Sequence, residues 1–291
     1  MPTPLPQPER PGSLDHARYC AELTEQARQF HAVVRDADLG APVPTCPEWT
    51  LRELTVHLGG AYRWMAEIVR TRASANVPDE DVPAFAGPGP ETTPDGRAPS
   101  AEALGDWFSE GALLLVEQLL AAGPDEPVWS WSGDGRAGFW ARRATHETVI
   151  HRADACLAAG AEFTVDQVVA ADCLDEWLEI ATSPVMWQYN PNLHKLTPRA
   201  GSTLHLHATD VRAPEGGGGE GAASSAEWLI DVGADGLAFR HAHEKATVAL
   251  RGPVADVLCV LYRRLPRDSD RVQVLGEAGL LDLWLEVVSF G

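Results

Sequence analysis

The chain has 291 residues and a formal net charge of −19, with 23 basic residues against 42 acidic ones. This balance excludes a nucleic-acid partner, because nothing in the chain would neutralise phosphates and no cluster of Lys and Arg stands out. The composition, 45% hydrophobic and 22% charged, is that of a globular protein of one or two domains. No apolar run is long enough to span a bilayer, so we expect no membrane partner.

The N-terminus and the cysteines indicate the compartment. Residues 1–12 are rich in Pro and lack a hydrophobic signal core, which predicts a disordered tail and a cytoplasmic protein. The five cysteines are widely spaced and contain no C-x-x-C pair. We therefore expect reduced thiols and no cysteine-ligated zinc site.

Four amphipathic helices are predicted in the first half of the chain. A T-x-x-E capping box, Thr50 with Glu53, marks the start of the second helix, and Gly160 follows the end of the fourth. The stretch 71–99 shows no periodicity, so we expect it to be either disordered or a lid over a site, with disorder the simpler expectation. The four helices are predicted at about 13–36, 50–70, 100–122 and 137–159.

The second half of the chain changes its pattern. Thr164 and Gln167 form another capping box, which predicts a fifth helix that Pro184 stops. Beyond it, alternation with period two predicts strands, and the Gly-rich stretch 214–225 predicts a flexible hairpin loop. The fold class is therefore a helical domain followed by a smaller α+β domain with an antiparallel sheet. Strands are predicted at about 203–208, 228–232, 237–241, 245–250 and 271–275, and helices at about 253–265 and 277–288.

The fourth predicted helix carries a carboxylate and an imidazole four residues apart. Glu147 and His151 project from one face of a helix, so they could grip one ion, or they could be an ordinary surface pair. His146 precedes His151 by five residues and lies well off that face, so this is not the H-E-x-x-H zinc-protease pattern. On the second helix, His57 lies in an apolar stripe, where a histidine is more often a satisfied core residue than a ligand.

A helical bundle can bring His57 to the face of Glu147 and His151, since metal sites in bundles use inward side chains of separate helices. Two imidazoles and a carboxylate suit a divalent metal with an open coordination position, which favours catalysis over a structural role. Zinc fits this ligand set best, and nickel, iron or manganese would also accept it.

Two segments stand out together: the first is Pro44 to Thr50 with His57, and the second is His146 to Ala155. They resemble the two signature segments of the mycothiol-dependent maleylpyruvate isomerase family of actinobacteria. The resemblance extends to Gly201 to Asp210 and Leu250 to Pro253 in the second half, and so covers nearly the whole chain.

This resemblance implies a DinB-like four-helix bundle, residues 13–162, and a sterol-carrier-like α+β domain, residues 163–291. It also implies zinc on His57, Glu147 and His151, with mycothiol as the thiol cofactor. A metal-coordinated thiol is deprotonated and becomes a nucleophile at neutral pH. The implied activity is cis/trans isomerisation of an unsaturated acid or transfer of the thiol to an electrophile. The residues that would bind mycothiol are not assigned.

Other residues are candidates beside the metal site. Arg264 is expected to offer a cation to an acidic substrate, with a solvated arginine as its alternative, and Asp154 is expected either to orient a ligand or to be a surface charge. His205 and His207 share a strand face, and because no carboxylate is placed near them we favour an exposed sheet face over a metal pair. Trp49 and Trp64 are expected at the mouth of the site.

Departures from the family pattern bear on the substrate. Glu48 stands where the family often has a small residue, and the insertion 71–99 could remodel the entrance, so maleylpyruvate itself is not carried over. The alternative function is a non-catalytic protein that binds a metal or an apolar ligand; a regulatory zinc module is disfavoured because the chain lacks a zinc-thiolate cluster. The expected partners are a small thiol and a small electrophile, and the expected assembly is a monomer or homodimer.

Overall fold

The computed structural model describes residues 14–89, 99–211 and 226–288. The expected N-terminal tail, 1–12, and the Gly-rich loop, 214–225, lie outside these residues. The chain divides into two compact units, His16–Val165 and a second unit that starts at Asp166. None of the helices in the described ranges is long and apolar enough to cross a membrane.

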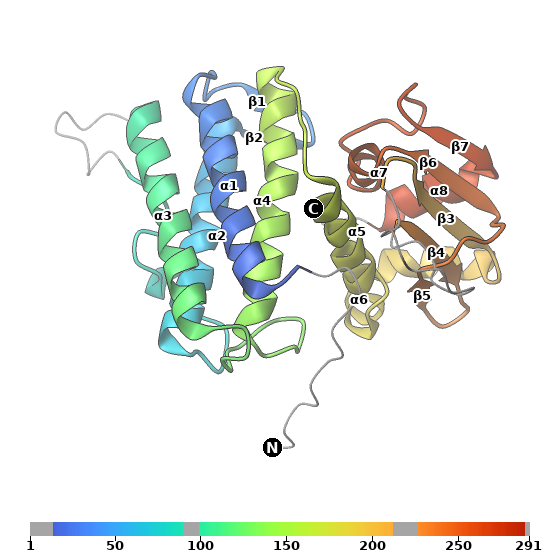
Figure 1. Ribbon diagram of the computed structural model, residues 1–291, viewed down its shortest axis with the longest axis horizontal. Coiled ribbons are helices and arrows are strands. Elements are labelled where there is room, and N and C mark those ends of the chain that lie inside the picture. The colour runs from blue at the N-terminus through green and yellow to red at the C-terminus, as the bar shows by residue number, and fades with distance from the viewer. Residues whose placement is uncertain (1–13, 90–98, 212–225, 289–291) are drawn as a thin grey trace. The chain divides into compact units, whose positions relative to one another are not determined.

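The N-terminal unit is a bundle of four long helices that lie side by side in Figure 1. Helix α2 packs against α3 and α4, and α1 packs against the same two helices. Their interior is apolar and aromatic, with Phe30 and Phe108 stacked at a centroid distance of 4.8 Å. The helices are α1 (His16–Arg35), α2 (Leu51–Thr71), α3 (Ala101–Ala122) and α4 (Ala137–Ala159).

Helix α4 is buried around most of its circumference, so polar groups on it need partners inside the protein. Arg152, for example, is buried and donates from Nε to Oε1 of Gln26 at 2.8 Å. The helix ends at Ala159 with Gly160 in the left-handed conformation (φ 66°), as the sequence predicts. Three charged residues of α4, Arg143, Arg152 and Asp154, are therefore buried inside the bundle.

The start of α2 is fixed by its capping box, which the structure confirms. The backbone N–H of Thr50 donates to Oε2 of Glu53 at 2.9 Å. A short hairpin that the sequence did not predict precedes it, with β1 (Pro42–Val43) antiparallel to β2 (Cys46–Thr50). This hairpin sets Trp49 directly before the first turn of α2.

The segment after α2 is ordered over residues 72–89, so the expectation of disorder is wrong there, and 90–98 lie outside the described residues. Two indole N–H groups bond its carbonyls: Trp64 donates to Val77 O at 2.9 Å and Trp107 donates to Ala84 O at 3.1 Å. The segment also contains a short 3-10 helix, η1 (Asp79–Asp81), followed by the buried Val82. Side-chain hydrogen bonds from two bundle tryptophans to its backbone carbonyls hold it in place.

Gly59 of α2 leaves room for Trp107, which predicts the effect of a methyl group there. A Cβ at this position would lie 2.6 Å from Cη2 of Trp107 and closer still to Cζ3, and the Arg63 guanidinium covers the ring at 4.4 Å. We expect Gly59→Ala to destabilise the bundle by about 1–3 kcal/mol, although alanine normally stabilises a helix interior by about 0.5–1 kcal/mol. Urea unfolding checks this prediction.

Gly279 of α8 (Ala278–Val287) provides the control, because a Cβ there meets no atom within 4 Å. We expect Gly279→Ala to leave the free energy of unfolding unchanged or to raise it. A Gly59→Ala protein as stable as the unsubstituted chain would show that the Trp107 ring is free to move aside.

The C-terminal unit is built on a five-stranded sheet in the order β5-β4-β3-β6-β7, shown in Figure 1. Three of its four pairings are antiparallel, as expected, whereas β3 and β6 are parallel. Its strands are β3 (Thr203–Ala208), β4 (Glu227–Val232), β5 (Leu237–Arg240), β6 (Val248–Gly252) and β7 (Gln273–Gly276), and its helices are α5 (Gln167–Ala181), α6 (Pro184–Tyr189), η3 (Pro191–Arg199), α7 (Val254–Leu261) and α8 (Ala278–Val287).

Several helix boundaries differ from the sequence expectation. Helix α5 begins at Gln167 and is capped by Asp166, whose Oδ1 accepts from Val168 N at 3.0 Å, so the predicted Thr164 cap is wrong. The sequence did not predict α6 and η3.

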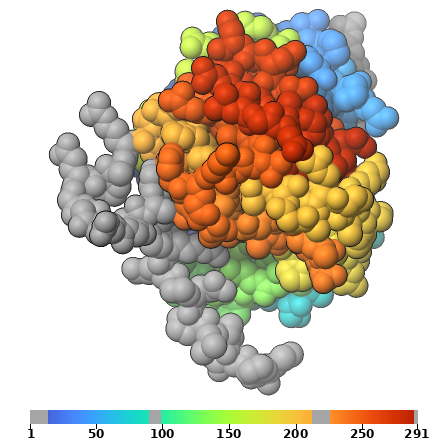
Figure 2. Space-filling model, turned by 90° about the vertical axis from the view of Figure 1, so that its right-hand side faces the viewer, coloured from blue at the N-terminus to red at the C-terminus, as the bar shows by residue number. Residues whose placement is uncertain are grey.

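Ion pairs join η3 to α8 across the surface of the C-terminal unit. Lys195 pairs with Glu286 at 2.9 Å and Arg199 pairs with Glu277 at 2.6 Å. In Figure 2 the yellow residues near 190–200 adjoin orange and red residues of the same unit.

Candidate metal site

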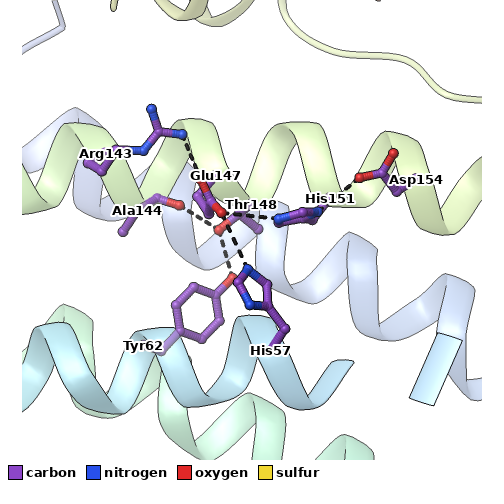
Figure 3. A network of polar contacts seen from close by, with 8 residues as sticks. All are labelled: His57, Tyr62, Arg143, Ala144, Glu147, Thr148, His151 and Asp154. Atoms are coloured by element: carbon purple, nitrogen blue, oxygen red, sulfur yellow. Dashed lines mark hydrogen bonds and ion pairs between the residues drawn. The ribbon is translucent and has the colours of Figure 1, made fainter. Parts of the chain in front are cut away.

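The bundle brings His57 of α2 together with Glu147 and His151 of α4, as Figure 3 shows. Nε2 of His151 lies 3.1 Å and Nε2 of His57 lies 3.5 Å from the same oxygen, Oε1 of Glu147. The two imidazole rings stand nearly perpendicular at a centroid distance of 5.0 Å. One ligand atom from each of the three residues lies within 4.8 Å of the other two, so three donors from two helices converge on one point.

Asp154 fixes the orientation of His151. Nδ1 of His151 donates to Oδ2 of Asp154 at 2.9 Å, and the hydroxyl of Thr45 donates to the other carboxylate oxygen. Asp154 is fully buried, which excludes the alternative of a surface charge. Because its partner occupies Nδ1, the imidazole presents Nε2 to Glu147, which is the arrangement that orients metal-binding histidines.

Arg143 holds the second oxygen of Glu147, and the sequence interpretation missed it. Its Nη2 donates to Oε2 of Glu147 at 2.8 Å, one helical turn away on α4. Burial disfavours the charged carboxylate, but Arg143, His151 and His57 outweigh it and hold the pKa of Glu147 well below its usual value. The i, i+4 spacing of Arg143 and Glu147 was the available sequence signal.

The protonation state of His151 is set by its two carboxylate neighbours, Asp154 and Glu147. Burial alone would lower the pKa of His151, but hydrogen bonds to Asp154 and Glu147 raise it to about 9. Both ring nitrogens therefore carry protons in the metal-free protein at neutral pH, and a bound cation would take the place of the proton on Nε2.

His57 lies at the solvent edge of its helix stripe, not in the core. Its side chain is 38% exposed, whereas its neighbours Leu54 and Leu58 are fully buried, so the core-histidine alternative is wrong. Trp49 covers the ring at a centroid distance of 4.7 Å and lies 6.2 Å from the His151 ring. The donors are thus open to solvent on one side and bordered by an indole, as expected for Trp49.

These donors match what a divalent metal needs. The set contains two imidazoles and an ionised carboxylate. Among the residues that the structure describes, three protein atoms converge, which leaves a coordination position for an exogenous ligand. This ligand set suits zinc, and iron, nickel or manganese also accept it.

Residues 20–156 match the family model described as the mycothiol maleylpyruvate isomerase N-terminal domain. The matched range contains the hairpin, the bundle and all three convergent donors. The bundle is a mycothiol maleylpyruvate isomerase N-terminal domain. The suspected family is therefore confirmed for the part of the chain that holds the site.

Two solved structures resemble the chain beyond this domain. One is a mycothiol-dependent maleylpyruvate isomerase, 15% identical, which covers 91% of this chain and 95% of its own with a TM-score of 0.56. The other is a histidine-to-alanine mutant described by the same name, 16% identical over the same shares, with a TM-score of 0.54. At this identity they establish a shared fold over both units, and no curated protein sequence matches the chain.

Two other residues of this isomerase-family domain, His146 and Trp64, do not join the three donors. His146 is fully buried beside Tyr19 of α1, with a ring-centroid distance of 6.1 Å, as its position off the Glu147 face predicts. Trp64 packs against Trp129 and Trp140, so its expected place at the site mouth is not supported.

Arg264 lies in the turn after α7, because that helix ends at Leu261 and not near 265. Its Nη1 donates to the carbonyl of Tyr262 at 2.6 Å, within the C-terminal unit. Its role toward an acidic substrate stays a prediction.

Arg143 is expected to strengthen metal binding at this site, because it holds the carboxylate of Glu147. We expect Arg143→Met to weaken metal binding about 10-fold or more, since outer groups that hold a ligand typically contribute 10–100-fold to affinity. Arg142→Met on the neighbouring position of α4 is the control and should bind as the unsubstituted chain does. Isothermal titration with zinc measures both, and equal affinities for the two variants would contradict the role of Arg143.

Proposed function

We propose that the protein binds a divalent metal, zinc by its ligand chemistry, through His57, Glu147 and His151, and that it uses the thiol of mycothiol as a nucleophile. The convergence of two imidazole Nε2 atoms on one oxygen of Glu147, inside a domain of the mycothiol maleylpyruvate isomerase family, carries this proposal. The family match supports a thiol-dependent isomerase.

The residues of the site have separate tasks. Glu147 supplies the negative charge, with Arg143 holding its second oxygen, and Asp154 keeps Nε2 of His151 directed at the site. A bound divalent metal would lower the pKa of a coordinated thiol and so supply a thiolate at neutral pH. Trp49 shields the imidazoles with an apolar face.

The bundle's buried cysteines argue for a thiol from outside. Burial raises the pKa of Cys20 to about 11, and burial also raises the pKa of Cys156. Both side chains are almost fully buried, so they stay protonated and out of reach of a substrate. Cys20 and Cys156 are therefore excluded as nucleophiles, whereas Cys46 of β2 is half-buried. The match to a mycothiol-dependent family favours a small-molecule thiol as the nucleophilic sulfur.

Two reactions follow from such a thiolate. It can add to an activated double bond of an unsaturated acid, allow rotation about the resulting single bond, and leave again, which gives cis/trans isomerisation with the thiol regenerated. It can also stay attached to the electrophile, with a proton taken up at the neighbouring carbon, which gives S-transfer. The names of the two structural neighbours favour isomerisation.

The experiment compares the two reactions directly. Zinc-loaded protein is incubated with mycothiol and either maleylpyruvate or a bimane electrophile, and isomer and conjugate are measured against the rate with thiol alone. We expect isomerisation or conjugation above that rate. Metal-loaded protein that accelerates neither reaction would contradict the enzyme proposal and support the alternative of a non-catalytic binding protein.

A further inference from the structure

A second group of histidines gathers around one carboxylate in the C-terminal unit. His205 and His207 of β3, Glu227 of β4 and His243 after β5 each offer one ligand atom within 4.8 Å of the others. The expectation of an exposed sheet face without a carboxylate is therefore wrong: His205 is 7% exposed and Glu227 is 9% exposed. Glu227 stands twenty positions after His207 in the sequence, so no local spacing connects the two residues.

Strand register brings these residues together. His207 of β3 is the antiparallel partner of Glu227 of β4, and His205 lies on the same face two residues earlier. The opposite face carries Leu206 and its partner Trp228, whose indole N–H donates to Asp175 of α5 at 2.6 Å. The alternation thus directs apolar side chains to one face and the imidazoles with Glu227 to the other.

A further contact fixes the segment that carries His243. The neighbouring His241 lies 3.2 Å from the backbone carbonyl of Glu227 through Nδ1 and 3.1 Å from Oδ1 of Asp175 through Nε2. These contacts hold the chain beside β4 where the side chain of His243 reaches Glu227.

Three imidazoles converge on one atom, Oε2 of Glu227. The distances are 2.8 Å from Nε2 of His205, 2.6 Å from Nδ1 of His243 and 3.5 Å from Nδ1 of His207. The three rings form a nearly equilateral triangle with centroid separations of 5.7, 5.7 and 5.8 Å. His205 and His243 are hydrogen-bonded to this oxygen, which has two lone pairs, and the third imidazole, of His207, lies 3.5 Å from the same atom.

We propose that His205, His207, Glu227 and His243 form a second divalent-metal site, separate from the donors of the bundle. Three imidazole nitrogens and one carboxylate oxygen match the preference of zinc and related transition metals. Four protein ligands make a closed set, which is typical of a structural site and not a catalytic one. The ion would tie β3, β4 and the segment after β5 together and stabilise this half of the sheet.

Burial, together with the neighbouring His207 and His243, lowers the pKa of His205 despite its contact with Glu227.

Metal binding is tested in the full chain carrying His57→Ala and Glu147→Gln. These substitutions remove two donors of the bundle, so that the metal bound by this variant reports on the second site. We expect one equivalent of zinc by titration, and cobalt to give the intense visible absorption of a four-coordinate site. Adding His207→Ala and His243→Ala should weaken zinc binding by at least about 100-fold, more than the loss of a supporting group outside the ligand set. Zinc should also raise the thermal midpoint only when the second site is intact.

Two further variants distinguish specific metal binding at these four residues from nonspecific binding to other histidines. His194→Ala in the same background removes an exposed histidine of the same unit and should retain the full equivalent. His243 has a side chain 73% exposed, so His243→Ala alone tests a ligand without disturbing the sheet. Absence of metal in the starting background, or affinity unchanged by His207→Ala with His243→Ala, would overturn the proposal.

Discussion

Replacing Glu147 with Gln is expected to remove the metal of the bundle and the thiol-dependent activity with it. Oε1 of Glu147 is the atom on which His57 and His151 converge, and it carries the only negative charge among the three donors. Gln keeps the shape but cannot supply that charge. We expect zinc affinity at this site to fall at least about 100-fold, beyond the range seen for supporting groups, and product formation to fall to the rate with thiol alone.

Metal content and activity must fall together for this result to support the site. Elemental analysis should show the loss of one equivalent, with metal at the second cluster unaffected. Glu117→Gln, an exposed position on α3, is the control and should retain both metal and activity. A Glu147→Gln protein that keeps its full metal content would show that these three residues do not form the binding site.

Asp154→Asn is expected to weaken metal binding about 10–100-fold although Asp154 touches no metal, because it fixes the ring of His151. The carboxylate accepts from Nδ1 of His151 at 2.9 Å and also accepts from the hydroxyl of Thr45. Asn fills the same volume but places an amide where a carboxylate oxygen now is, so the imidazole loses its charged partner. Competition with a chelator of known affinity measures the change.

Thr45→Val separates orientation of His151 from general disturbance of this buried site. It removes the hydroxyl from the other oxygen of Asp154 and leaves the His151 contact intact, so a smaller loss of affinity is expected. Urea unfolding of both metal-free variants detects any loss of fold. Equal losses in the two variants, or no loss in Asp154→Asn, would contradict the orienting role.

The convergence of His57, Glu147 and His151 could be predicted from sequence because residue spacing along a helix determines which side chains share a face. Glu147 and His151 are four residues apart on one helix, and the capping box at Thr50 fixed the start of the helix that carries His57. Burial was harder to predict, because neighbours in space decide it. His57 was expected in an apolar stripe but lies at its solvent edge, and Asp154 had two possible positions until its complete burial was seen.

Features that depend on distant or irregular segments could not be predicted. The hairpin before α2 has only two residues in β1, too few for a periodic signal, yet it places Trp49 beside the imidazoles. The ordered conformation of residues 72–89 depends on hydrogen bonds from Trp64 and Trp107. No local sequence pattern predicts these hydrogen bonds. Glu227 likewise meets His205 only through the pairing of β3 with β4.

The central claim is that a metal held by His57, Glu147 and His151 receives the thiol of mycothiol. The most direct measurement is the absorption spectrum of the cobalt-substituted protein during titration with mycothiol, with S-methylated mycothiol as the control. We predict a new sulfur-to-cobalt charge-transfer band that saturates at one equivalent of mycothiol and is absent with the methylated thiol and in Glu147→Gln. A spectrum that mycothiol leaves unchanged at saturating concentration would contradict the claim.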